Sequence, residues 1–277
     1  MSSLTVRYIR SSEPHTGSFN MAADDVLARG VVGSGYHSIL RMYSFDPPTV
    51  SLGRNQAVSE VDITACERKG WDVVRRSTGG RSLLHLNDIC YSIIVPIESD
   101  VFKELRRLYQ GVAISLTSVL NSYGIPASAM ELPVKHSFNL KLKKSRLCIS
   151  AQVRGEVHVK GRKITSASQR IYRDSILQHG SIFLRGEPTV IADIVPTDLV
   201  QGIDFGARLK ERVITIEEVQ TQPISSEDFI KAFTSQLCQY FGFNLANKPI
   251  KISELEEIAA LQNNFTLSPL KQEFSAA

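Results

Sequence analysis

The chain has 277 residues and a formal net charge of +4. Hydrophobic residues make up 43% of it and charged residues 22%, which is typical of a globular protein with a sizeable core and excludes a disordered chain. So small a basic excess favours an acidic partner only where the basic residues cluster.

Targeting, metal-binding and common catalytic signals are missing from the sequence. No apolar run follows a basic start, and none is long enough for a membrane helix, so we expect a cytoplasmic protein that does not bind membranes. P-loop, Rossmann, zincin and serine-hydrolase signatures are absent as well. The cysteines form no C-x-x-C pair, which predicts free thiols and no metal site; they are Cys66, Cys90, Cys148 and Cys238.

Up to residue 96, strands and short helices follow one another without the regular alternation of a doubly wound fold. Asp62 is a predicted helix cap, and Gly70 a predicted helix end. In chain order we predict a strand at 5–9, a helix at 18–29, strands at 38–45 and 49–53, a helix at 62–70, and strands at 71–76, 81–86 and 90–96.

The second half of the chain begins with a long helix from about 101 to 123, which has one apolar stripe and ends at Gly124. A polar, basic loop is expected at 135–147. A hairpin that turns at 160–161 and a strand at 175–184 follow it.

After residue 223 the chain is predicted to be helical, with Ser226 and Ser253 as N-caps and a capping box between Ser253 and Glu256. The whole pattern predicts an α+β fold with a mixed β-sheet flanked by helices. We expect a main domain at residues 1–222 and a helical carboxy-terminal extension at 223–277 packed on it.

The first candidate site is the run RRSTGGR, from Arg75 to Arg81, between two predicted strands. Gly79 and Gly80 let the backbone come close to a ligand. Their N–H groups, together with the arginines, suit a carboxylate or a phosphate. The same spacing also fits a plain turn with solvated arginines.

The second candidate site is a basic segment. Between Lys135 and Arg173 the chain has eleven Lys and Arg residues and one acidic residue, Glu156, a bias that favours an anionic partner. Within it, cations beside Cys148 would stabilise a reactive thiolate, although a small core residue fits this position too. Lys163 is either a surface residue or a buried cation directed at a carbonyl or phosphate oxygen.

Six stretches, in one order, resemble the biotin/lipoate protein ligase and lipoyl-transferase superfamily, whose members attach lipoyl, octanoyl or biotinyl groups to a lysine of a carrier domain. The resemblance implies a class II synthetase-like catalytic architecture and makes residues 1–222 an acyltransferase domain. The stretches are NMAADDVL, PPTVSLGRNQ, VVRRSTGGRSLLH, YSIIVP, GRKITSASQR and ILQHGSIFL.

Within that superfamily the chain most resembles the cysteine-dependent octanoyltransferases of the LipM type. It has their arginine pair, their Thr-Gly-Gly-Arg and Leu-His, and a cysteine, Cys148, thirteen residues before Gly161 of G-R-K-I. The resemblance implies that Cys148 and Lys163 are catalytic. The substrate-binding residues that it implies are Arg75, Arg76, Ser77, Thr78, Gly79, Gly80, Arg81, His85, Ser166, Ala167, Gln178, His179 and Gly180.

The chain departs from the LipM pattern at three places near the implied site. The residues after Cys148 are ISAQ, where the family often has Phe-Asp-Ala-Pro. Ser166 precedes Ala167 in a strand where the family usually has a glycine, and Leu86 stands where an aspartate commonly follows the histidine.

The resemblance implies octanoyl transfer from octanoyl-acyl carrier protein to a lysine of a lipoyl domain through a Cys148 thioester, as in lipoate biosynthesis. The acceptor would be the glycine cleavage H protein or the E2 subunit of a 2-oxoacid dehydrogenase. Such carrier domains are typically acidic and suit the basic segment. No cofactor is required, and nucleic acid is not a partner.

Three other functions remain open at this point. An ATP-dependent lipoate–protein ligase would form an acyl-adenylate and need ATP and Mg. An octanoyl amidotransferase would move the acyl group between carrier domains. A non-catalytic protein of this fold would only bind a carrier domain or nucleic acid.

Overall fold

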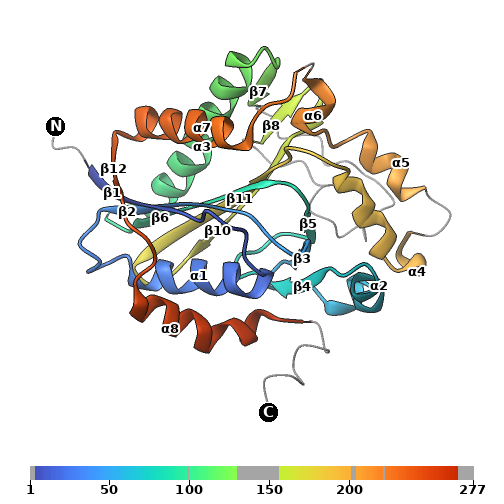
Figure 1. Ribbon diagram of the computed structural model, residues 1–277, viewed down its shortest axis with the longest axis horizontal. Helices are drawn as coiled ribbons and strands as arrows, with labels where there is room; N and C mark the ends of the chain where they lie inside the picture. The colour runs from blue at the N-terminus through green and yellow to red at the C-terminus, as the bar shows by residue number, and fades with distance from the viewer. Residues whose placement is uncertain (1–3, 99, 130–155, 201–203, 221, 268–277) are drawn as a thin grey trace.

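The computed structural model describes residues 4–98, 100–129, 156–200, 204–220 and 222–267. Helices lie on both faces of a six-stranded mixed β-sheet, and two three-stranded sheets complete the fold (Figure 1). Among the described residues, no helix has both the length and the apolar character needed to cross a bilayer. The predicted α+β fold with a mixed sheet and flanking helices is confirmed.

The main sheet has the strand order β10–β11–β6–β2–β1–β12. Neighbours from β10 to β2 are antiparallel, whereas β2, β1 and β12 run parallel. Its strands are β1 (Leu4–Arg10), β2 (Ser38–Tyr43), β6 (Ile89–Pro96), β10 (Thr165–Ile171), β11 (Ser175–Ile182) and β12 (Phe243–Asn247).

Each smaller sheet contains one of the candidate segments. The first, in the order β4–β3–β5, has the RRSTGGR run between β4 and β5, and the second, β7–β8–β9, contains Lys163. Their strands are β3 (Thr49–Leu52), β4 (Asp72–Arg75), β5 (Leu83–His85), β7 (Ala127–Ala129), β8 (Val157–Val159) and β9 (Arg162–Lys163).

Helices α3 (Val101–Ser122) and α7 (Ser226–Phe241) cover one face of the main sheet, and α1 (Gly17–Gly30) and α8 (Ile252–Leu261) lie on the other side (Figure 1). The shorter helices are α2 (Ile63–Arg68), α4 (Thr197–Val200), α5 (Phe205–Lys210) and α6 (Ile216–Val219), with 3₁₀ turns at Val58–Glu60, Pro188–Ile194 and Gln262–Phe265.

Successive side chains of β6 point to opposite faces of the main sheet and join different apolar clusters. Its odd-numbered residues, from Ile89 to Val95, belong to the largest apolar cluster with residues of α3 and α7. Ile94 packs with residues of α1 on the opposite face. Since side chains two apart share a face, Cys90 and Ser92 also lie on the α1 side, which is therefore partly polar.

Two local signals of the sequence, the helix cap at Asp62 and the hairpin turn at 160–161, are confirmed. Asp62 caps α2 by accepting a hydrogen bond from Ala65 N at 2.9 Å. The hairpin turns at Lys160 and Gly161, which have φ angles of 51° and 76°, as a two-residue turn between twisted strands requires. The hairpin ends at Lys163, and the chain continues from there into the main sheet as β10.

The carboxy-terminal segment differs from its prediction. It contains the strand β12, which pairs in parallel with β1 at the edge of the main sheet, so the segment is not helical throughout. The short sequence FNLAN gives no strand signal, because the partner that stabilises it lies at the other end of the chain. The division of the chain at residue 222 stays a prediction.

The helix starts in this segment are also shifted. The N-cap of α7 is Ser225, not Ser226. In α8 the capping residue is Lys251, whose N–H donates to Glu254 Oε2 at 2.7 Å, so the capping box expected between Ser253 and Glu256 is wrong. Extended backbone at Lys251 starts the helix before Ser253 is reached.

Candidate functional site

Three adjacent strands of the main sheet present polar side chains to α1. On β2, β6 and β11, side chains two apart share this face. Because the face is covered, each polar group on it needs a hydrogen-bond partner inside the protein. The buried polar residues and tyrosine of this face are Arg41, Tyr43, Cys90, Ser92, Ser175, His179 and Ser181.

Asp24 of α1 is the centre of a buried network on this face. Its carboxylate accepts hydrogen bonds from His179 Nδ1 at 2.9 Å, from Tyr43 OH at 3.1 Å and from Arg41 Nη1 at 3.1 Å. Arg41 also donates to Asn20 Oδ1 at 2.5 Å. Burial opposes ionisation, but the hydrogen bond from His179 and the charge of Arg41 outweigh it and lower the pKa of Asp24. Asp24 therefore stays ionised, and its negative charge is paired with the positive charge of Arg41.

His179 connects this network to the RRSTGGR run. Because a carboxylate only accepts, Nδ1 donates to Asp24, and in the neutral ring Nε2 is left to accept from the Thr78 hydroxyl at 2.7 Å. Asp24, His179 and Thr78 thus form a continuous chain of hydrogen bonds from α1 through β11 to the loop between β4 and β5.

Arg76 holds the loop of the RRSTGGR run in shape. Its guanidinium donates to Ser51 O at 2.7 Å, to Gly79 O at 2.9 Å and to Arg81 O at 2.6 Å. The residue is 5% exposed. The loop therefore folds around its own arginine, and the alternative of solvated arginines is wrong for Arg76.

Arg75 anchors the neighbouring turn in the same way. Its Nη1 donates to Gly53 O at 2.9 Å and to Gln56 O at 2.7 Å. Here the two turns touch: a Cβ on Gly53 would lie 2.0 Å from Gly80 O. Only glycine fits at position 53, and Gly80 has the positive φ of 92° that its part of the loop requires.

Further hydrogen bonds dock this loop onto β10 and the residue after it. Ser168 Oγ donates to Gly79 O at 3.1 Å, and Ser77 Oγ accepts from Tyr172 OH at 3.1 Å. Tyr172 follows β10 directly. The RRSTGGR loop is therefore a rigid wall beside the sheet.

A pocket opens between α1, this loop, the edge strand β10 and its neighbour β11. Its enclosed volume is about 30 Å³, and about 360 Å³ when the space of its open mouth is included. We call it the central pocket. The residues that line it are Met21, Tyr43, Ser51, Arg76, Leu83, His85, Ser166, Ala167, Ser168, His179, Gly180 and Ser181.

Gly180 is needed where β10, β11 and β6 come together at this pocket. A Cβ there would lie 2.5 Å from Tyr91 Oη and 2.7 Å from Ser166 O. Any side chain would push the strands apart, which accounts for the glycine of the Gln-His-Gly sequence.

Lys163 is buried, which agrees with one of the two sequence interpretations, while its direction toward a carbonyl or phosphate oxygen stays a prediction. It is 2% exposed, and its Nζ lies 2.5 Å from Glu156 Oε1, whose side chain is equally buried. Its backbone N–H donates to Arg212 O at 2.7 Å. Glu156 lines a second, narrow cavity that Gln178 and Ala167 also line, and Ala167 lines the central pocket as well.

Lys163 lines neither the central pocket nor the second cavity. The other site residues that the sequence predicts are placed as follows. Arg76, His85, Ser166, Ala167, His179 and Gly180 line the central pocket. Arg75, Ser77, Thr78, Gly79, Gly80 and Arg81 belong to the wall beside it, and Gln178 lines the second cavity. Cys148 lies outside the described residues, so its position relative to Lys163 stays a prediction.

The sequence reasoning missed several residues that complete the site. Asp24, Arg41 and Tyr43 hold His179 in place, and Ser51 and Ser181 line the pocket. One signal was available: the polar Asn20 and Asp24 are four residues apart, on one face of a helix. The strand residues gave no signal, because buried polar pairs across a sheet have no fixed spacing in sequence.

Comparisons with known proteins agree with this architecture. Residues 16–238 match the model of the family described as lipoyl protein ligase A/B catalytic domain. The Octanoyltransferase LipM of Staphylococcus epidermidis is 31% identical, over 91% of this chain and 94% of that protein.

Solved structures share the fold. A bipartite lipoate protein ligase from Thermoplasma acidophilum, analysed with its E2 lipoyl domain, has a TM-score of 0.72 at 18% identity and covers 95% of this chain and 93% of its own. A lipoate-protein ligase A bound with ATP also has a TM-score of 0.72 at 18% identity, covering 94% of each chain. Since the family model spans most of the sequence, the chain belongs to the lipoyl protein ligase A/B catalytic domain family.

Proposed function

We propose that the chain is an octanoyltransferase of lipoate biosynthesis, which transfers an octanoyl group from octanoyl-acyl carrier protein to a lysine of a lipoyl domain. The observation that carries the proposal is the 31% identity, over 91% of the chain, to a protein named an octanoyltransferase. The proposed reaction needs neither a nucleotide nor a metal.

The transfer takes place in two steps. In the first, the Cys148 thiolate attacks the thioester carbonyl, and the bond to the phosphopantetheine sulfur breaks, releasing that thiol. In the second, the ε-amine of the acceptor lysine attacks the acyl-enzyme, loses a proton, and forms an amide while Cys148 leaves as the thiolate. Exchange between thioesters is nearly balanced, so amide formation drives the sequence forward.

The other cysteines support the choice of Cys148. Burial raises the pKa of Cys66 to about 12 and raises that of Cys238 as well. The pKa of Cys90 is raised well above its ordinary value by burial and by the charge of Asp88. None of these three is suited to attack as a thiolate at neutral pH, whereas Cys148 lies in the basic segment, between Lys144 and Arg154.

Lys163 stabilises the negative charge that develops on the carbonyl oxygen. Its ammonium group is buried, where a charge acts through a low dielectric and has more effect than in water. Glu156 fixes the position of Nζ, so the group is preorganised. The octanoyl tail lies along Ala167 in the central pocket, where each methylene removed from water contributes about 0.8 kcal/mol.

The carriers reach this site along the basic segment. Carrier domains of this kind are acidic, and complementary charges raise the rate of encounter. Part of the basic excess is used within the protein: Arg162 pairs with Glu218 at 3.1 Å, and Arg170 lies 3.6 Å from Asp25. The glycine cleavage H protein and the E2 lipoyl domains are the proposed acceptors.

An ATP-dependent ligase is the second candidate, favoured by the fold that the chain shares with a lipoate-protein ligase bound with ATP. In that reaction Lys163 would bind the carbonyl and phosphate oxygens of an acyl-adenylate, and Cys148 would be dispensable. The two functions therefore differ in their need for ATP and for one thiol.

The deciding experiment incubates the purified chain with an apo lipoyl domain and one of three donors: octanoyl-acyl carrier protein, free octanoate with ATP and Mg, or an octanoylated lipoyl domain. We expect modification of the acceptor from the acyl carrier protein without ATP, its loss in Cys148→Ala, and its retention in the control Cys238→Ala. Transfer only from free octanoate with ATP would replace the proposal with the ligase, and transfer only from the lipoyl domain with the amidotransferase.

A further inference from the structure

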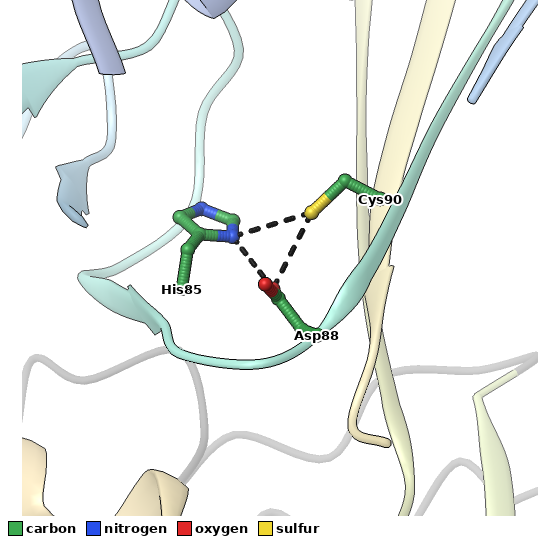
Figure 2. Close-up of side chains that lie close together, drawn as sticks. All are labelled: His85, Asp88 and Cys90. Carbon is green, nitrogen blue, oxygen red and sulfur yellow. Dashed lines mark hydrogen bonds and ion pairs between the residues drawn. The ribbon is translucent and has the colours of Figure 1, made fainter. Parts of the chain in front are cut away.

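Three side chains with metal-binding atoms meet beside the central pocket. His85 ends β5, Asp88 lies in the turn, and Cys90 is the second residue of β6, so one short segment brings them together (Figure 2). Their ligand atoms lie within 4.8 Å of one another, and all three residues are buried. The proposed acyl transfer uses neither Asp88 nor Cys90. We call these residues the His85–Asp88–Cys90 cluster.

The distances in the cluster are those between ligands of one metal ion. His85 Nδ1 lies 2.8 Å from Asp88 Oδ2 and 3.5 Å from Cys90 Sγ, and Sγ lies 3.3 Å from Oδ2 (Figure 2). With the usual zinc bond lengths, the nitrogen, oxygen and sulfur ligands of a tetrahedral site lie about 3.3–3.6 Å apart. To reach tetrahedral spacing, the side between His85 and Asp88 must widen by about 0.6 Å and the side between Asp88 and Cys90 by about 0.3 Å, as the bond lengths imply.

In the cluster, more hydrogen-bond donors are directed at one carboxylate oxygen than it has lone pairs. Asp88 Oδ2 is the common acceptor for His85 Nδ1–H, for the Cys90 thiol and for the hydroxyl of Ser181. A carboxylate oxygen has two lone pairs, so three donors compete for them. A cation would satisfy the same oxygen together with the ring nitrogen and the sulfur.

The charges also balance. When a divalent cation binds, the thiol proton of Cys90 goes to solvent, and the ring proton of His85 moves from Nδ1 to Nε2. One thiolate, one carboxylate and a neutral imidazole then hold two positive charges, so the buried complex is neutral.

A partner for the other ring nitrogen is already in place. Ser51 Oγ lies 3.0 Å from His85 Nε2 and can accept a hydrogen bond from Nε2–H, and Arg76 Nη1 donates to the same hydroxyl at 3.2 Å. A metal-binding histidine almost always donates its second N–H in this way, which fixes the tautomer and the ring.

Two pockets give access to the cluster. His85, Ser51 and Ser181 line the central pocket. Asp88 lines another cavity of about 290 Å³, which opens beside Ser11 and Asn87. A hydrated ion can enter, and a water molecule can supply the fourth ligand.

We propose that the His85–Asp88–Cys90 cluster is a binding site for one zinc-like divalent cation, held by His85 Nδ1, Asp88 Oδ2 and Cys90 Sγ. The bound ion ties β5, β6 and the neighbouring Ser181 of β11 together at the floor of the central pocket. The proposed transfer itself requires no metal. It also revises our expectation of no metal site, which rested on the missing C-x-x-C pairs and ignored the H-x-x-D-x-C spacing of this turn.

The test uses cobalt as a spectroscopic probe for the zinc site. The reduced, chelator-treated protein is titrated with Co²⁺, and Zn²⁺ affinity is measured by competition with a chromophoric chelator. We expect one Co²⁺ per chain, the visible absorption of a tetrahedral site and a thiolate-to-cobalt charge-transfer band. Cys90→Ser should remove that band and weaken zinc binding at least about 100-fold, more than the loss of an outer partner does.

Two controls make the result decisive. Cys148→Ser keeps the cluster and should keep the band; loss of the band in this variant would place the metal at the proposed nucleophile and overturn the inference. Ser51→Ala keeps all three ligands and should weaken zinc binding about 10-fold, because it removes only the partner of His85. This variant decides the matter if Cys90→Ser does not fold. Absence of the band in the unmodified protein, or unchanged affinity in both Cys90→Ser and Ser51→Ala, would refute the site.

Discussion

Asp24 Oδ2 on α1 lies 2.9 Å from His179 Nδ1 on β11, although the two residues are 155 positions apart. The other ring nitrogen lies 2.7 Å from Thr78 Oγ1 in the RRSTGGR loop. A helix, a sheet strand and a loop are therefore joined through one imidazole, which also lines the central pocket. The shape of the pocket depends on this connection, because each of its three walls contributes one member.

Replacing Asp24 should therefore affect both stability and its pH dependence. Asp24→Asn leaves Arg41 without a buried anion, which we expect to cost about 3–5 kcal/mol of unfolding free energy at pH 7. Because the pKa of Asp24 is lowered from its ordinary value of 3.8, its stabilising effect is complete above that value and is lost as the pH falls through the lower, folded-state pKa.

Urea unfolding of both proteins between pH 7 and pH 3 measures this effect. The unmodified protein should lose stability below about pH 4, and Asp24→Asn should lose less over the same range. Parallel curves for the two proteins would mean that Asp24 is not the group that titrates.

Gly53 and Gly79 offer a matched pair for testing the loop. A Cβ on Gly53 would meet Gly80 O at 2.0 Å, whereas a Cβ on Gly79 would have no atom within 4 Å. We expect Gly53→Ala to displace the RRSTGGR loop, to lower the unfolding free energy by about 1–3 kcal/mol and to reduce transfer. Gly79→Ala should change stability by less than about 0.5 kcal/mol. Thermal unfolding of both variants measures this difference in stability. An equal loss of stability in the two variants would contradict the close contact of the two turns.

The ion pair between Lys163 and Glu156 gives a third prediction. Both side chains are buried, so Lys163→Ala leaves an unpaired carboxylate and should cost about 3–5 kcal/mol of stability in addition to any loss of transfer. The double variant Lys163→Met with Glu156→Gln removes both charges and should recover most of that stability.

The rate of octanoyl transfer by the double variant distinguishes a structural role of Lys163 from a catalytic one. If Lys163 stabilises the carbonyl oxygen, the double variant is well folded and still slower than the unmodified protein by a factor of about 100 or more. A stable double variant with normal transfer would limit Lys163 to a structural role.

Much of the fold could be predicted from local patterns. The strand predicted at 90–96 and the cap at Asp62 depend on neighbouring residues only, so they are visible in the sequence. Strand β12 could not be found in this way, because its stability comes from pairing with β1 at the other end of the chain.

In the site, too, some features follow from local sequence and others depend on contacts between distant segments. The position of the RRSTGGR run beside a pocket follows from its glycines and its flanking strands. That Arg75 and Arg76 donate to backbone carbonyls depends on the approach of Gly53 to Gly80, a contact between two turns that no spacing rule predicts. The partners of His179 lie on α1 and in the loop, and only the folded chain brings them together.

The central claim, a covalent thioester on Cys148, is tested most directly by intact-protein mass spectrometry after incubation with octanoyl-acyl carrier protein alone. The account predicts one added octanoyl group, removed by hydroxylamine and mapped to Cys148. It also predicts that an apo lipoyl domain removes the group by accepting it. An unmodified chain that still octanoylates the acceptor, or an adduct that persists in Cys148→Ala, would contradict it.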